Sequence, residues 1–438
     1  MPLAKRSYLR DISGVFGSYV ISLVASFSVY IILTRLLGPE KFGVYSTLLV
    51  IPLITVGFVQ MGIRRAALFH LGKKHFPEQR IVSAVFTLLL IASFLGILVS
   101  GAGFLVYNHP AYKTSYMVMV LLAIPFKLAV LYTGGIFLGK DEIRSVNLQN
   151  WTPLVLNLLF VALFVWIFPM DILGATIAYM LSNGLVAVYY LVTLYRKYHV
   201  TLGVDHDVIR ALVAKGVLFA VSFVVMQLNL RVDLLILGRI GVAAETGYYS
   251  LAVQIAEQLW LLPAAVGVVV MSRTANSTSQ TKMTEETSRL MRLTLLAGAL
   301  ISLALVLVVP WLVPLLFGPA FSESSQLILW LLPGIVAFMV FRVLNGQLSG
   351  MGRPGYSAVI FSFALLINVL LNFLWIPRYG ARGAAWATDI SYFAGSLALA
   401  VAYCYVNHTS FFRLFCPHKS DLSGLGSRFN AYFTNKSK

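Results

Sequence analysis

Twelve apolar segments, each long enough to cross a bilayer, follow one another along the chain with only short polar connections between them. These predicted spans cover residues 13–36, 43–62, 81–107, 115–138, 146–168, 172–195, 211–237, 246–271, 290–317, 324–349, 355–376 and 383–406. A helix needs about 20 apolar residues to cross the hydrocarbon core, and open sheet edges are not tolerated there. The composition agrees, because 59% of the residues are hydrophobic and only 11% are charged. We therefore expect an all-α polytopic membrane protein with about 12 transmembrane helices and no soluble domain.

The Lys and Arg residues are distributed unevenly over the connections. Of the 33 in the chain, 24 fall in one alternating set of loops and tails and six in the other. Positive side chains are retained on the cytoplasmic side of a membrane. We therefore expect a multi-pass protein of the plasma (inner) membrane with both termini in the cytoplasm. The net charge of +17 then reflects topology and contact with membrane lipids, and a nucleic-acid partner is not expected.

Three pairs of similar segments occur in the same order in the two halves of the chain. The pairs are 43–46 and 247–250, 122–125 and 331–333, and 166–178 and 375–387. In the clearest pair, Gly43-Val44-Tyr45-Ser46 opens the second span and Gly247-Tyr248-Tyr249-Ser250 opens the eighth. The pairs predict two pseudo-symmetric six-helix lobes related by an axis along the membrane normal.

The repeat also predicts where the lobes begin and end. We expect an N-terminal lobe at 1–195, a cytoplasmic linker at 196–210, a C-terminal lobe at 211–406 and a basic cytoplasmic tail at 407–438. The tail is interpreted as touching the membrane surface, either as an irregular segment or as an ordered interfacial helix.

Six charged residues are predicted to lie within spans: the cations Lys127, Arg231 and Arg342, and the acids Asp233, Glu257 and Asp389. A charge at membrane depth costs about 2.5–3.5 kcal/mol on insertion scales, so it is kept only where it faces other helices or a wet cavity. Gln227 and Arg231 are four residues apart and share a helix face. We interpret this face as a polar wall of a transport cavity. The alternative is a buried network that only joins helices, and because three acids can neutralise three cations, charge alone leaves it open.

The three acids have two interpretations of their own. Glu257 could be a protonatable group that couples transport to an ion, or it could be the counter-ion of Arg231, which is the favoured interpretation. Asp233 and Asp389 are candidates for the same two roles.

Two further patterns are assigned no chemistry. The run Gly134–Lys140 resembles a phosphate-binding loop, but Asp141 stands where Ser or Thr is required and the run ends a span. Asn368 and Asn372 share a helix face and are expected to join helices by hydrogen bonds. All seven histidines fall in predicted loops or tails, which argues against a metal site within the membrane.

Two longer segments resemble a known family. Arg35–Ser46 (RLLGPEKFGVYS) and Ile376–Thr388 (IPRYGARGAAWAT) resemble segments of the polysaccharide flippases, of the O-antigen type, which belong to the multidrug/oligosaccharidyl-lipid/polysaccharide exporter superfamily. The resemblance implies two six-helix lobes around a V-shaped, partly cationic cavity. It also implies a substrate, an undecaprenyl-pyrophosphate-linked oligosaccharide that moves from the inner to the outer leaflet. Such a protein serves lipopolysaccharide or other polysaccharide biosynthesis.

The sequence and the resemblance together give a specific expectation. The protein is expected to be a transporter and not an enzyme, and to flip a lipid-linked oligosaccharide by alternating access. The expected cavity residues are Arg231, Lys127, Arg342, Arg35 and Gln227, and the expected coupling or counter-ion residues are Asp233, Glu257 and Asp389. Arg35 could receive the head group near the outer exit, or it could simply anchor or cap the first helix.

The expectation includes partners and alternatives. No cofactor is expected, although H+ or Na+ could drive transport, and other polysaccharide-assembly membrane proteins could be partners. One alternative function is an ion-coupled drug or cation exporter of the same superfamily, which would depend more on the three acids. A more distant alternative is a membrane glycan polymerase or ligase, for which the chain lacks a sizeable external loop.

Overall fold

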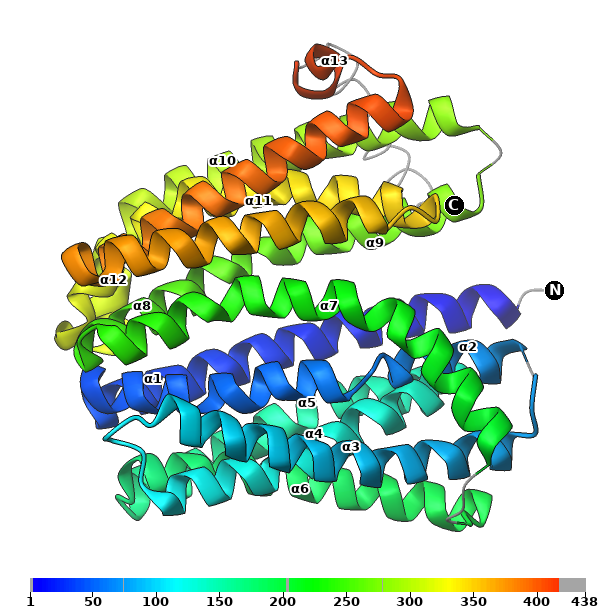
Figure 1. Ribbon diagram of the computed structural model, residues 1–438, viewed down its shortest axis with the longest axis horizontal. Coiled ribbons are helices and arrows are strands. Elements are labelled where there is room, and N and C mark those ends of the chain that lie inside the picture. Colours follow the sequence, from blue (N-terminus) through cyan, green and yellow to red (C-terminus); the bar gives the residue numbers. More distant parts are fainter. Residues whose placement is uncertain (1–2, 74, 202–204, 278, 417–438) are drawn as a thin grey trace. The chain divides into compact units, whose positions relative to one another are not determined.

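The computed structural model describes residues 3–73, 75–201, 205–277 and 279–416, and every regular element within these ranges is a helix (Figure 1). The α-helices of the first part are α1 (Leu3–Val59), α2 (Ile63–Lys73), α3 (Glu78–Tyr107), α4 (Thr114–Gly139), α5 (Ile143–Val161), α6 (Asp171–Tyr198) and α7 (His206–Ile240). Those that follow are α8 (Ala243–Ala256), α9 (Leu261–Ala275), α10 (Gln280–Phe317), α11 (Ser322–Gly350), α12 (Gly355–Asn407) and α13 (Phe411–Phe415). Short π or 3₁₀ turns are η1 (Ala162–Ile167), η2 (Glu257–Trp260) and η3 (Pro319–Phe321).

The described helices match the twelve predicted spans. Nine helical stretches are long and apolar enough to cross a membrane, by length and composition, in the part of the chain that was described. Two of them, Gly17–Lys73 and Gly355–Asn407, each contain two of the predicted spans, and α7 contains the span predicted at 211–237. The prediction of an all-helical polytopic membrane protein is thus confirmed.

Two glycines separate the spans that α1 and α12 each combine. Gly38 has φ 71° and Gly380 has φ 56°, and both break the helical geometry inside the element that contains them. A positive φ carries a steric cost for residues with a Cβ, which glycine avoids. Pro39 follows directly, at the first position of the next helical segment, where its missing N–H is not needed.

Two local features were not predicted. A short helix, α2, follows the second span at 63–73, where the sequence suggested only a basic loop. The eighth span is not one helix, because the 3₁₀ turn at Glu257–Trp260 separates α8 from α9 just before Pro263. Pro125 and Pro333, by contrast, are held inside α4 and α11.

The chain packs into two compact units. The first unit comprises Met1–Leu251 together with Val313–Glu323. In it α4 packs against α2, α3 and α6, while α7 packs against α1, α2 and α3. The unit boundary lies within α8, whereas the sequence predicts a lobe boundary in the linker at 196–210, so the division into six-helix lobes stays a prediction.

The second unit comprises Ala252–Leu312 and Ser324–Lys438. Glycines bring its α9 and α11 close together, since a Cβ on Gly346 would lie 2.4 Å from the carbonyl oxygen of Gly267. Asn368 donates to Ser391 at 3.3 Å and to Thr388 at 3.5 Å, which joins the two halves of α12. The expectation that these amides join helices is confirmed for Asn368, whereas Asn372 donates to Asn368 within the same helical segment.

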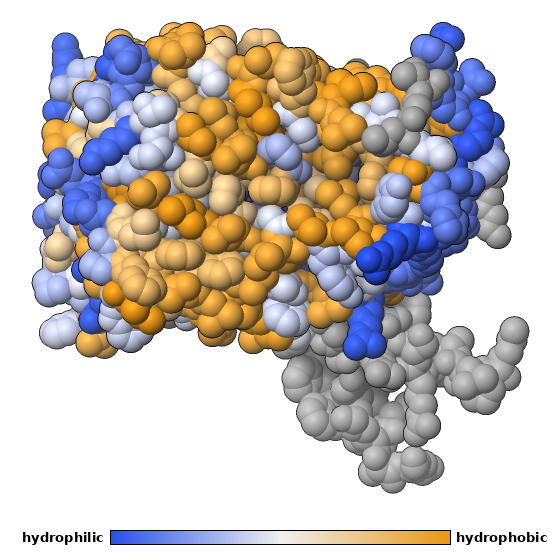
Figure 2. Space-filling model, turned by 90° about the horizontal axis from the view of Figure 1, so that it is seen from below, coloured by the Kyte–Doolittle hydropathy of each residue, from blue (hydrophilic) through white to orange (hydrophobic). Residues whose placement is uncertain are grey.

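The surface agrees with a membrane environment. On the face drawn in Figure 2, apolar side chains form a broad band and hydrophilic ones gather at its two ends. Leu90 and Phe94 of α3 and Tyr189 of α6 are among the large apolar side chains that are exposed. Exposed apolar surface of this extent is typical of contact with lipid.

Candidate functional site

Lys127 is the charged residue placed deepest in α4, and it lies in the first unit. Its side chain is partly buried, and its helix neighbours Ala123, Ile124 and Leu128 are buried. The amine forms no hydrogen bond or ion pair with any residue that the structure describes. The alternative interpretation, pairing of Lys127 with an acidic neighbour, therefore finds no support within those residues.

Arg342 lies in the second unit against aromatic rings. Its guanidinium carbon is 4.8 Å from the ring centroid of Trp260 and 5.3 Å from that of Phe338. The Nε atom is buried and has no hydrogen-bond partner. Glu257 is close enough to interact electrostatically with the guanidinium. Arg342 is therefore stabilised by cation–π contacts while one buried donor remains unsatisfied.

The 3₁₀ turn η2 positions this aromatic contact. Glu257 and Trp260 stand at its two ends, and the indole N–H of Trp260 donates to the carbonyl oxygen of Ile335 at 3.1 Å. Trp260 is buried and its ring also lies 5.6 Å from that of Tyr392. The turn thus sets an acid and an aromatic ring beside the helix that carries Arg342.

The polar residues of α7 divide between two faces. Asn229 and Asp233 are buried, whereas Gln227 and Arg231 are only partly buried. One carboxylate oxygen of Asp233 accepts from the Tyr249 hydroxyl at 2.5 Å. The guanidinium of Arg231 donates to the carbonyl oxygen of Leu230 at 3.1 Å, one of its interactions. The face of Gln227 and Arg231 is the more accessible one, as the helical spacing predicts.

Arg35 is exposed and contacts the end of α10. Its Nε donates to the carbonyl oxygen of Leu316 at 2.8 Å, and its Nη2 donates to that of Leu315. The last carbonyls of a helix have no partner within it, so a guanidinium there is a favourable cap. The structure thus adds to the alternative interpretation of Arg35 as a cap, but the capped helix is α10 and not the first one.

Asp389 has a partner in the backbone of α11. One of its carboxylate oxygens accepts from the amide N–H of Gly334 at 3.1 Å. A Cβ on Gly334 would lie 2.2 Å from that oxygen, so only glycine permits this approach. Asp389 therefore has a packing role next to Pro333, which leaves it less available as a coupling group.

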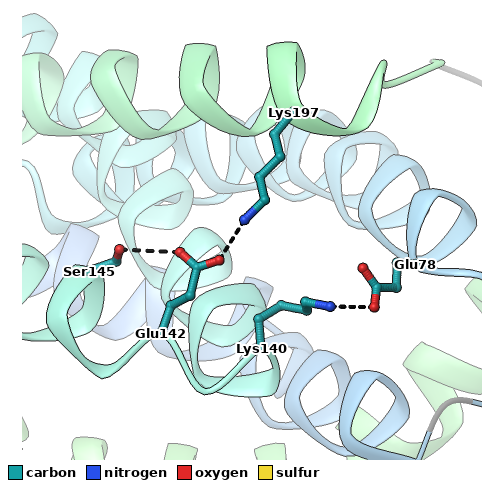
Figure 3. Close-up of polar contacts among 5 residues, drawn as sticks. All are labelled: Glu78, Lys140, Glu142, Ser145 and Lys197. Carbon is teal, nitrogen blue, oxygen red and sulfur yellow. Dashed lines mark hydrogen bonds and ion pairs between the residues drawn. The ribbon is translucent and has the colours of Figure 1, made fainter.

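Ion pairs at the predicted cytoplasmic end of the first unit involve acids outside the spans (Figure 3). Lys140, which follows α4, pairs with Glu78 at the start of α3. Glu142 pairs with Lys197 of α6 at 2.6 Å and also accepts from the Ser145 hydroxyl. These contacts join the ends of four helices, although exposed pairs of this kind each contribute about 0–1 kcal/mol.

Three residues near these charges were missed by the sequence reasoning. Tyr249 belongs to the repeated segment 247–250, and its partner Asp233 could not be identified from spacing. Trp260 follows Glu257 by three residues, which was a signal for a shared helical face. Arg64 was assigned to a loop because the residues after the second span are basic, but it lies in α2.

Comparison with known proteins places this fold in a family. A model of the family described as polysaccharide biosynthesis protein matches residues 8–272, which is more than half of the chain. A model of the MatE family matches residues 218–374. The relatives include the "Putative O-antigen transporter" of Shigella flexneri, 23% identical, with 90% of this chain and 97% of that protein covered. The capsular polysaccharide biosynthesis protein CapF of Staphylococcus aureus is 20% identical, with coverages of 90% and 99%.

Solved structures share the fold. An inward-facing MATE-family multidrug resistance transporter has a TM-score of 0.74 at 13% identity, with 88% of this chain and 94% of that chain covered. The lipid II flippase MurJ in an inward closed conformation has a TM-score of 0.72 at 14% identity, with coverages of 97% and 93%. At this level of identity, the likeness shows the fold. The chain is a member of the polysaccharide biosynthesis protein family, and it has the fold of the superfamily that includes MATE transporters and MurJ.

Proposed function

We propose that this protein flips a lipid-linked oligosaccharide, carried on undecaprenyl diphosphate, from the inner to the outer leaflet of the plasma membrane. The observation that carries the proposal is Lys127, a cation in the middle of a span that pairs with no acid among the described residues. An unpaired cation at this depth is costly unless an anion or water reaches it. The diphosphate of a lipid-linked glycan supplies such an anion.

The chemistry of the cargo requires a polar route. Stripping water from a charge costs tens of kcal/mol in an ideal low-dielectric medium, so a diphosphate and several sugars cannot cross hydrocarbon unaided. Lys127 in the first unit and Arg342 in the second would each offer donors to diphosphate oxygens. Arg231 and Gln227, on the more accessible face of α7, would line the same route. The lipid chain can remain in the bilayer.

Buried aromatic side chains surround Arg342 in the second unit. Trp260, Phe338 and Tyr392 lie within 6 Å of one another by ring centroid. Because these rings are buried, their role in this structure is to stabilise the guanidinium of Arg342 within its unit.

We propose alternating access between two six-helix lobes, with both termini in the cytoplasm.

The acids favour this function over a drug or cation exporter. An exporter of organic cations needs accessible carboxylates, but Asp233 is bonded to Tyr249 and Asp389 to the backbone of Gly334. Glu257 lies next to Arg342. Coupling to H+ or Na+ would then fall to Glu257 before the other two acids.

Complementation tests the proposal in cells. In a strain that lacks the gene, Lys127→Ala should reduce surface polysaccharide about tenfold or more at equal membrane abundance, while Lys127→Arg should restore most of it. Lys113→Ala, at an exposed position just before the same helix, is the matched control and should have no effect. Full export by Lys127→Ala would contradict the proposed role of this cation.

A further inference from the structure

Arg64 is a second cation of the first unit that pairs with no acid among the described residues. It is the second residue of α2 and is partly buried. The guanidinium lies against α4, because a Cβ on Gly134 would be 3.9 Å from both its Nε and its Nη2. The same Cβ would be 2.9 Å from the amide oxygen of Gln149. The guanidinium therefore lies close to a buried amide of α5.

Among the described residues, the neighbours of Arg64 are polar and uncharged or carry a like charge. Gln149 is buried and donates to the Thr133 hydroxyl at 2.7 Å, which leaves its amide oxygen near Gly134. Arg64 forms no hydrogen bond or ion pair with any residue in the described ranges. The phenol of Tyr19 interacts with it electrostatically, and Arg65 adds a like charge. A guanidinium has five N–H donors, so these donors remain available to water or a ligand.

Three acids at this end of the unit are paired with other cations. Glu78 pairs with Lys140, and Glu142 pairs with Lys197 (Figure 3). Asp205 accepts from Arg80 at 2.6 Å. An arrangement that only balanced charge would be expected to place one of these acids beside the half-buried Arg64. Within the described ranges, none of these acids pairs with the partly buried Arg64.

The glycine-rich run in α4 explains how Arg64 comes to lie there. A Cβ on Gly135 would be 2.5 Å from the carbonyl oxygen of Arg64, and one on Gly139 would be 2.8 Å from the Cβ of Leu71. These two glycines therefore let the backbone of α2 approach α4 closely. The run that resembles a phosphate-binding loop is a packing surface that fixes the position of Arg64.

Lys127 lies on the same face of α4 as Gly134, two turns away. Seven residues in a helix correspond to about 10 Å along the axis. Arg64, which lies against Gly134, and Lys127 are therefore at two different positions along the axis of α4, on the same helix face. Both are cations without an acidic partner in the described part of the chain, one near the predicted cytoplasmic end and the other near the middle of the span.

We propose that Arg64 receives the diphosphate of the lipid-linked cargo at the cytoplasmic side, before Lys127 takes it at mid-membrane. This inference rests on the proposed function and adds a site to it. Arginine suits the role because its planar fork can bind two phosphate oxygens at once. The amide of Gln149 lies close to the guanidinium of Arg64 and would help to hold it in position.

Binding of farnesyl diphosphate, a short polyprenyl diphosphate, to the purified full-length protein in neutral detergent tests the inference. Arg64→Gln should weaken binding about tenfold, as expected for the loss of a charge-assisted bidentate contact. Arg65→Gln removes the same charge from the adjacent, exposed position and should change binding less than about twofold. Arg64→Lys keeps the positive charge, and the variant should fold as the wild type does. It should no longer bind farnesyl diphosphate in preference to farnesyl monophosphate. This variant decides the question if Arg64→Gln does not fold.

The outcomes separate this inference from the function on which it rests. If Lys127→Gln weakens binding but Arg64→Gln and Arg64→Lys bind as the wild type does, the role of Arg64 is wrong and the proposed function stands. Equal losses in Arg64→Gln and Arg65→Gln would mean general surface attraction and would also overturn it. If the wild type binds no farnesyl diphosphate, and Arg64→Gln lowers only its attachment to phosphatidylglycerol vesicles, then Arg64 binds membrane lipid and both proposals fail.

Discussion

Gly43 and Gly247 hold equivalent positions in the internal repeat, and they lie against each other in the first unit. A Cβ on Gly43 would be 2.8 Å from the amide nitrogen of Gly247 and 2.3 Å from the carbonyl oxygen of Ala243. A Cβ on Gly247 would be 2.0 Å from the carbonyl oxygen of Pro39. The two glycines therefore let the backbones of α1 and α8 approach each other closely within the first unit.

Replacing Gly247 by alanine should destabilise the protein. The new methyl group would meet the backbone at Pro39 and not a flexible side chain, so the helices must separate, at a cost of about 1–3 kcal/mol or more. Thermal unfolding in detergent measures the change. Gly101→Ala in α3 is the matched control, because a Cβ there meets nothing within 4 Å, and it should be neutral or slightly stabilising. Equal melting temperatures for both variants would argue against the close contact.

Removing the hydroxyl of Tyr249 should leave a buried carboxylate with one donor fewer. We expect Tyr249→Phe to lower the free energy of unfolding by about 1–3 kcal/mol, because Asp233 is buried. If the two groups act through this hydrogen bond, Tyr249→Phe should cost much less when Asp233 is already replaced by Asn. The measurement is a double-mutant cycle of thermal stability. Simple additivity of the two changes would rule out the coupling.

The start of α7 should loosen in acid. Hydrogen bonding to the Arg80 guanidinium lowers the pKa of Asp205 below its usual value of 3.8. A lowered pKa in the folded state means that the stabilisation is fully present above about pH 4 and is lost as the pH falls through the folded pKa. Hydrogen exchange at the first turn of α7, compared at pH 5 and pH 3, should show the loss. Arg80→Gln should return the folded pKa of Asp205 toward 3.8, so less protection should be lost between pH 5 and pH 3. An unchanged loss in that variant would exclude Arg80 as the cause.

The sequence predicts the fold better than the site, for physical reasons. The hydropathy and length of a segment predict whether it forms a membrane-spanning helix, and the twelve predicted spans correspond to helical stretches of the structure. The break at Glu257–Trp260 was missed because a 3₁₀ turn has no hydropathy signal, and α2 was missed because its basic residues are typical of a loop.

Partners of charged residues depend on the way helices pack, which spacing along one helix does not determine. Asp389 accepts from Gly334 and Asp233 accepts from Tyr249, and neither contact could be predicted from the residues alone. The pairing of Glu257 with Arg231 stays a prediction, although Glu257 lies close to Arg342. That Lys127 pairs with no acid among the described residues likewise could not be predicted without its surroundings in three dimensions.

The central claim is that cations within the spans carry a lipid-linked diphosphate across the membrane. It is tested most directly by the rate at which undecaprenyl-diphosphate-linked oligosaccharide becomes accessible on the far side of proteoliposomes that contain the purified protein. The wild type should move it, and Lys127→Gln and Arg342→Gln should each slow it about tenfold or more, with Arg65→Gln close to the wild type. Wild-type rates in both cation variants, or a wild type that moves only organic cations, would contradict this account.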